Sequence, residues 1–168
     1  MIIEEVAKKE REGKMDMNEK KKPAKRVSLV SVKLVRESSV LYSNRKIRHP
    51  EDAYLLLKDF LEDKDREHLI VVGLDSKTQP TMLTVAHIGA IGSCIVSGRE
   101  IMKPLILSNA TSFIVGHNHP STDTTPSNAD IECTKRLKKV GELMDIPLRD
   151  HLIIGGNSYV SLKEEGVF

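Results

Sequence analysis

The most informative stretch of this chain is residues 111–121, which reads Thr111-Ser112-Phe113-Ile114-Val115-Gly116-His117-Asn118-His119-Pro120-Ser121. Its first half is apolar and β-branched, so it predicts a strand that runs directly into the two histidines. Residues i and i+2 of a strand point to the same face, so the imidazoles of His117 and His119 lie side by side while Asn118 points away. Pro120 cannot continue the hydrogen-bonded ladder. Two adjacent imidazoles at the end of a strand predict a metal site.

The segment after these histidines supplies a candidate third ligand. Pro126-Ser127 opens a predicted helix over residues 128–144, and Asp130 lies in its first turn. On one interpretation, Ser127 and Asp130 form a capping box, in which each side chain bonds a backbone amide of the other residue. On the other, Asp130 completes a set of two imidazoles and one carboxylate. Three such ligands leave a fourth tetrahedral position open, as catalytic zinc sites do, and the neighbouring histidines favour this interpretation.

This spacing resembles a known signature. His-x-His, then ten residues, then Asp, with a Ser three positions before the Asp, is similar to the JAMM motif of the MPN (JAB) metallopeptidases. The likeness is greatest to the RadC branch, in particular to short RadC-like JAB domain proteins, and it runs from about Ile47 to the C-terminus. It includes Asp65-Arg66-Glu67-His68, Arg99-Glu100, Asn109-Ala110, Thr134-Lys135-Arg136-Leu137 and Asp150-His151. The family usually has Ser-Gly at Ser121-Thr122 and often Pro at Thr124, and both departures lie in the loop between the ligands.

The resemblance implies a fold, a cofactor and a reaction. The fold is α/β, a single MPN-type domain with a mixed, mainly antiparallel sheet and flanking helices. The cofactor is one Zn²⁺ per chain, and the reaction is hydrolysis of an amide or isopeptide bond in a protein or peptide substrate. By resemblance, Glu67 activates the zinc-bound water and Ser127 donates a hydrogen bond to the oxyanion. The residues alone would assign Glu67 to a solvated helix end and turn.

Hydrophobic patterning predicts the remaining elements. A helix with Pro near its first turn and an apolar face spans residues 50–61. Residues 69–74 and 81–88 predict an antiparallel hairpin, and residues 151–154 and 159–162 predict a second one around Gly155-Gly156-Asn157-Ser158. A short helix is expected over 99–107, where Pro104 near its middle would kink it unless the helix begins late.

Four other histidines are weaker candidates for the site. His151 follows Asp150 at a strand start and is a candidate to support a ligand, although packing or capping is the favoured interpretation. His87 is expected to be a partly buried, hydrogen-bonded histidine of its strand. His68 alternates in direction with Glu67, so both cannot reach one ion. His49 precedes the first predicted helix.

The N-terminal part of the chain differs from the rest. Residues 1–26 hold nine Lys/Arg and six Asp/Glu with few apolar residues, which predicts a disordered tail. Its basic cluster, residues 20–26, is interpreted first as a solubilising linker and second as a weak nucleic-acid contact. Residues 27–45 form a linker or an edge strand. The apolar positions 27, 29, 30, 32, 34 and 35 favour the strand, and the MPN-type domain occupies 46–168.

Composition is compatible with one domain and an appendage. The 168 residues are 39% hydrophobic and 30% charged, and the net charge of +2 comes from the tail. With 4% aromatic residues and no Trp, a nucleic-acid surface of stacking aromatics is poorly supported. No secretory segment or run of membrane-spanning length occurs, so we expect a cytoplasmic protein without membrane contact. Cys94 and Cys133 have no CxxC partner, which predicts reduced, buried thiols.

Other functions fit the sequence less well. The letters His-Asn-His do not make an HNH nuclease, because that motif is distributed over a ββα unit. The motifs of zinc deaminases, P-loop proteins and His-Glu-x-x-His peptidases do not occur. A non-catalytic scaffold is disfavoured because all the motif residues are present. The main alternative is a DNA-associated RadC-like accessory role in repair or recombination, without peptidase activity.

Overall fold

A five-stranded sheet carries the two histidines, with its strands in the order β2-β1-β3-β4-β5. The computed structural model describes residues 26–89 and 96–168. The strands are β1 (His68–Leu74), β2 (Pro80–Ile88), β3 (Ser112–Asn118), β4 (Leu148–Gly155) and β5 (Ser158–Ser161). Within the described residues, the helices are α2 (Pro50–Leu61), α3 (Gly98–Leu107) and α4 (Asn128–Leu143). Each predicted helix and hairpin of residues 50–162 is therefore confirmed, with bounds that shift by a few residues.

The sheet is mixed and mainly antiparallel, as the resemblance implies. β1 pairs antiparallel with both β2 and β3, and β5 pairs antiparallel with β4. Among the described strands, β3 and β4 form the only parallel pair. Parallel neighbours need a crossover connection, and α4 lies in that connection. The crossover explains why the helix after the histidines returns to the same part of the sheet.

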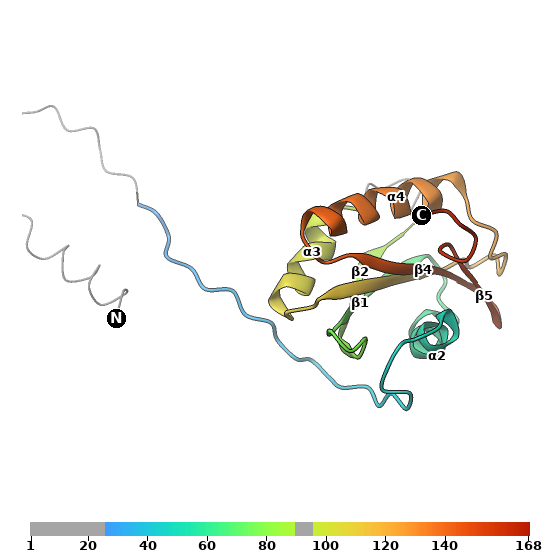
Figure 1. The fold of residues 1–168 in the computed structure, drawn as a ribbon, viewed down its shortest axis with the longest axis horizontal. Coiled ribbons are helices and arrows are strands. Elements are labelled where there is room, and N and C mark those ends of the chain that lie inside the picture. The colour runs from blue at the N-terminus through green and yellow to red at the C-terminus, as the bar shows by residue number, and fades with distance from the viewer. Residues whose placement is uncertain (1–25, 90–95) are drawn as a thin grey trace, which may run out of the picture. The chain divides into compact units, whose positions relative to one another are not determined.

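Helices cover both faces of this sheet. In Figure 1, α3 and α4 lie over one face and α2 lies over the other. Phe113 and Val115 of β3 belong to the hydrophobic cluster under α3 and α4, whereas Ile114 belongs to the cluster under α2. Because the direction of side chains alternates, His117 falls on the α4 face. Every residue of β3 is buried, so the strand delivers its histidine to the interior of the domain.

The structure also bears on the predictions for the helix that contains Pro104 and for the two cysteines. Helix α3 does contain Pro104, and the helix begins at Gly98, one residue earlier than predicted. Cys133 is a buried free thiol within α4, and burial raises the pKa of this thiol. Cys94 lies outside the described residues.

Of the two predictions for residues 27–45, a linker or an edge strand, the structure contradicts the strand. The described residues from 26 onward have no strand before β1. Val27, Leu29 and Val30 are 90%, 81% and 77% exposed. Their apolar neighbours come in pairs at 29/30 and 34/35, so they point in both directions and offer no single face to bury. Residues 33–168 form one compact unit. Residues 1–25, including most of the predicted disordered tail, lie outside the described residues.

None of the helices in the described part of the chain combines the length and the hydropathy needed to cross a membrane.

Candidate metal centre

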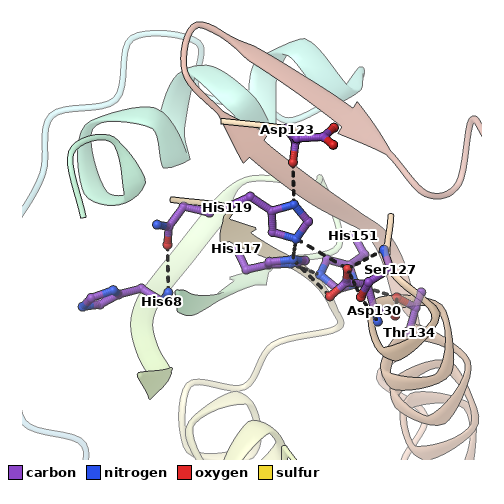
Figure 2. A network of polar contacts seen from close by, with 9 residues as sticks. His68, His117, His119, Asp123, Ser127, Asp130, Thr134 and His151 are labelled. Carbon is purple, nitrogen blue, oxygen red and sulfur yellow. Dashed lines mark hydrogen bonds and ion pairs between the residues drawn. The ribbon is translucent and has the colours of Figure 1, made fainter. Parts of the chain in front are cut away.

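Three side chains bring their ligand atoms together at the end of β3. The Nε2 atoms of His117 and His119 lie 3.1 Å apart. The carboxylate of Asp130 is 3.2 Å from the first through Oδ1 and 3.5 Å from the second through Oδ2. Ligand atoms of a tetrahedral zinc site lie about 3.3 Å apart, given zinc–nitrogen distances of about 2.0–2.1 Å. The donor set therefore has the size of a small divalent cation, and Figure 2 shows the three side chains pointing at one another.

Two elements place these ligands. β3 ends at Asn118. His117, within the strand, and His119, directly after it, therefore project from the same face. α4 begins immediately above that face, and Asp130 occupies its first turn with 2% of its surface exposed. His117 is fully buried, whereas the side chain of His119 is 14% exposed. The site thus opens to solvent on the side of His119.

The hydrogen-bond partner of Nδ1 determines which ring nitrogen of His119 carries the hydrogen. Its Nδ1 lies 2.6 Å from the backbone carbonyl oxygen of Asp123. A carbonyl oxygen only accepts hydrogen bonds, so Nδ1 of this imidazole carries the hydrogen and donates it. In the neutral ring, the lone pair of Nε2 then points toward His117 and Asp130.

A chain of buried hydrogen bonds fixes His117 in the same way. The hydroxyl of Thr134 donates to the carbonyl oxygen of Asp130 at 2.6 Å, which uses its only hydrogen. The same Oγ1 lies 2.6 Å from Nδ1 of His151, so that nitrogen must donate to it. Burial holds the pKa of His151 well below its usual range, so the ring is neutral and its Nε2 accepts. His117 then donates from Nδ1 across 2.8 Å, which leaves its Nε2 lone pair for the site.

Because of these bonds, the atoms that face one another in the site are all hydrogen-bond acceptors. Both Nε2 atoms are acceptors, and Asp130 is a carboxylate. Burial would raise the pKa of Asp130, but a proton lying between its carboxylate and His117, together with the bonds from Ser127, would hold that pKa well below its usual range. Facing lone pairs repel one another unless a cation or a proton lies between them. Two imidazoles and one carboxylate are a set that zinc binds when it keeps one coordination position open.

The two interpretations of Asp130 turn out to be compatible. Its Oδ2 accepts hydrogen bonds from the amide of Ser127 at 2.8 Å and from Oγ of Ser127 at 2.6 Å. Ser127 Oγ in turn accepts from the amide of Asp130 at 3.2 Å, which completes the capping box of α4. Oδ1 accepts none of these bonds and faces His117. One carboxylate oxygen therefore caps the helix and the other is directed into the site.

Glu67 is half-buried directly before β1, outside the three-residue cluster. Leu69 pairs with His117 across β1 and β3, so alternation puts Glu67 and the two histidines on the same face. Asn118 fixes the backbone on both sides of Glu67. Its Oδ1 accepts from the amide of His68 at 2.8 Å, and its Nδ2 donates to the carbonyl oxygen of Arg66 at 3.1 Å. The predicted base therefore lies directly before β1, the strand that pairs with β3.

Sequence reasoning underestimated two residues. It favoured packing or capping for His151, whereas the ring is fully buried and bonds a predicted ligand directly. It gave no role to Thr134, whose position four residues after Asp130 on the helix is the signal that was available. His87 is partly buried, as predicted, but its Nε2 has no hydrogen-bond partner among the described residues. His68 points away from the cluster, as expected (Figure 2).

Comparisons with known proteins identify the family of this chain. A family model described as the RadC-like JAB domain matches residues 47–167. The chain belongs to the RadC-like JAB domain family. The match begins three residues before α2 and includes every described helix and strand. The family that the sequence resembles is therefore confirmed, together with the fold class.

Curated relatives of this RadC-like JAB domain carry names that state no activity. A UPF0758 protein of Desulforamulus reducens is 45% identical over 121 residues, which are 72% of this chain and 53% of the relative. A UPF0758 protein of Clostridium kluyveri is 44% identical over 122 residues, 73% of this chain and 54% of the relative. One from Methanosarcina mazei is 40% identical over 130 residues, 77% of this chain and 57% of the relative. The chain spans about half the length of these relatives.

Proposed function

We propose that this chain is a zinc-dependent hydrolase of the JAMM type that cleaves amide or isopeptide bonds in a protein or peptide substrate. His117, His119 and Asp130 would hold one Zn²⁺ per chain. When bound, the ion supplies a Lewis acid that lowers the pKa of a water in its open coordination position toward ~7. Fe²⁺, Co²⁺ and Mn²⁺ suit the same ligand types, so the metal is part of what has to be measured.

The observation that carries the proposal is the set of facing lone pairs. Hydrogen bonds to Asp123 and His151 assign the Nδ1 hydrogens of the two histidines. A helix cap meanwhile occupies only one oxygen of Asp130. This arrangement is typical of metal-binding histidines, whose second ring nitrogen is held by a carbonyl or another polar group. A group of buried residues selected only for packing would have no need of such an arrangement.

Two further residues would move or hold protons during the reaction. The carboxylate of Glu67 would accept a proton from the attacking water and return it to the leaving nitrogen, so that water and an amide give an acid and an amine. The Oγ of Ser127 would donate to the carbonyl oxygen as negative charge develops there. To do so the hydroxyl must turn away from Oδ2 of Asp130, which keeps its bond from the Ser127 amide.

The test is a metal-dependent cleavage assay on an unbiased peptide library, read by mass spectrometry. Glu67→Gln removes the proton acceptor and leaves the three ligands in place. We expect it to retain metal and to lose turnover by about 10²-fold or more. Asp65→Asn is the matched control, because Asp65 is an exposed carboxylate two residues earlier. Its turnover should equal that of the wild type.

Two results would count against this function. Unchanged turnover in Glu67→Gln would reject Glu67 as the base. Failure of the metal-loaded chain to cleave any peptide of the library would reject the hydrolase itself. The alternative of a DNA-associated role has no observation in its favour among the described residues, since its best sequence feature is the basic cluster at 20–26.

A further inference from the structure

A cavity lies on the opposite side of the sheet from the metal centre. Its volume is about 440 Å³, within the range of small-molecule sites. Its floor is apolar and consists of Ala53 from α2, Leu74 from β1 and Ile114 from β3. These three residues belong to the hydrophobic cluster under α2, whereas His117 lies on the α4 face. A ligand here would not contact the proposed metal ligands.

Basic side chains from three separate segments line this cavity. Arg48 precedes α2, Arg149 lies in β4, and Lys163 follows β5. Among the residues that the structure describes, none of these three side chains makes an ion pair or a hydrogen bond. Unpaired cations from distant parts of a chain repel one another, so their convergence has a cost unless an anion joins them.

The position of Arg149 depends on an irregularity in the sheet. The register between β3 and β4 shifts so that Phe113 pairs with Leu148 while the next residue, Ile114, pairs with Asp150. Arg149 is the extra residue, and it is exposed between two buried neighbours. Bulges of this kind redirect a side chain and occur preferentially beside functional sites. Here the bulge adds a guanidinium to the cavity.

Two acidic residues, Asp150 and Glu164, also line the cavity, and burial raises the pKa of the Asp150 carboxyl while the charge of Lys163 lowers it. Asp150 is buried, and its oxygens already accept from Ser161 Oγ at 2.8–2.9 Å and from the amides of His151 and Lys163. Glu164 is exposed at the rim. The N-terminal end of α2 also borders the cavity, but the Asp52 carboxylate already caps it by accepting from the amides of Arg48 and His49 at 2.9 and 3.1 Å. Three cations against two carboxylates leave the lining with a small excess of positive charge, which favours an anion.

We propose that this cavity binds a small organic phosphate, with the phosphate between Arg48, Arg149 and Lys163 and an apolar body against Ala53 and Ile114. Three cations from three directions match a tetrahedral dianion better than a planar monoanion. Arginine pairs with phosphate through two parallel hydrogen bonds, and lysine acts as a point charge. The site is independent of the proposed hydrolase activity.

The experiment titrates phenyl phosphate into the full chain at constant ionic strength. Backbone amide NMR monitors the binding. We expect saturable shifts at Ala53, Ile114, Arg149 and Lys163. A phosphate can also reach the metal centre, so shifts at residues 117–119 are scored separately and do not count as support. Inorganic phosphate, which lacks the apolar body, should bind the cavity at least about tenfold more weakly than phenyl phosphate.

Two variants and a carboxylate probe, benzoate, complete the test. Arg149→Gln/Lys163→Gln should weaken binding of phenyl phosphate at least about tenfold. Lys103→Gln, which removes an exposed cation of α3, should leave that binding unchanged. Unfolding midpoints equal to that of the wild type would show that the variants are folded. The proposal is overturned if no saturable shift appears at the cavity, if the double variant binds as the wild type does, or if benzoate binds as tightly as phenyl phosphate.

Discussion

His151 and Thr134 stand behind the ligands and determine which nitrogen of His117 is available to a cation. The hydroxyl of Thr134 has one hydrogen, and its donation to the carbonyl oxygen of Asp130 sets the direction of every later bond in the chain. A single buried hydroxyl thus connects the helix that carries one ligand with the strand that carries another. Outer partners of this kind commonly change metal affinity by about 10–100-fold.

Thr134→Val tests this connection, because valine has nearly the same shape and no hydroxyl. Without its acceptor, Nδ1 of His151 is unsatisfied, and the ring gains stability from the other tautomer, which opposes donation by His117. We expect zinc affinity to fall about 10–100-fold while the chain stays folded. A competition titration against a chromophoric chelator measures it. Thr84→Val on β2 is the control, and equal affinity in both variants would contradict the proposed chain.

At the scale of elements, β3 and the start of α4 could be predicted almost completely from the sequence. The β-branched run, the alternation of the two histidines and the Ser127 cap are local signals, and local signals are visible in one sequence. The bond between His117 and His151 joins residues 34 positions apart. It depends on the parallel pairing of β3 and β4, which no local pattern specifies.

The wrong strand prediction for residues 27–35 also reflects a dependence on tertiary partners. A strand needs a partner edge and a face to bury, and apolar residues in sequence guarantee neither. The cationic cavity could not be predicted either, because it too depends on tertiary structure. Arg48, Arg149 and Lys163 are unremarkable where they stand in the chain, and only the tertiary fold brings them to one place.

The packing of α4 against the sheet gives a prediction about Gly141. A Cβ at this position would lie 2.6 Å from the carbonyl oxygen of Ile146 and 3.0 Å from a ring carbon of Phe113. Helix propensity alone favours alanine by about 1 kcal/mol, but overpacking against backbone costs about 1–3 kcal/mol or more. We expect the clash to win, so Gly141→Ala should lower the free energy of unfolding in urea.

Gly98→Ala is the matched comparison, because its Cβ would meet only the side chain of Val140, at 3.2 Å or more. This side chain can move, so the loss of stability should be clearly smaller. A Gly141→Ala variant as stable as the wild type would mean that α4 sits farther from β4 than the structure shows.

On the scale of the whole molecule, the sheet separates two chemically different regions. The α4 face holds the acceptor-rich metal centre, and the α2 face holds the cationic cavity. The boundaries of the tail, the linker and the domain remain predictions. The substrate and any partner of the full chain are likewise proposals, because the chain spans about half the length of its curated relatives.

The basic cluster at residues 20–26 allows a further prediction. If it contacts phosphates, binding of the full chain to duplex DNA should be weak and should decrease steeply with salt. Replacing its five Lys and Arg residues with Gln should remove most of that binding and flatten the salt dependence. Fluorescence anisotropy at several salt concentrations measures both. Binding that survives the substitutions would place the DNA contact elsewhere.

The central claim is that His117, His119 and Asp130 hold one divalent cation, and its most direct test is the metal content of the purified full chain by mass spectrometry. We expect about one Zn²⁺ per chain in the wild type, none in His117→Ala/His119→Ala, and the full content in His68→Ala, which removes an imidazole that points away from the cluster. Stoichiometric zinc in the double variant, or a wild-type protein that takes up no divalent metal, would contradict the account.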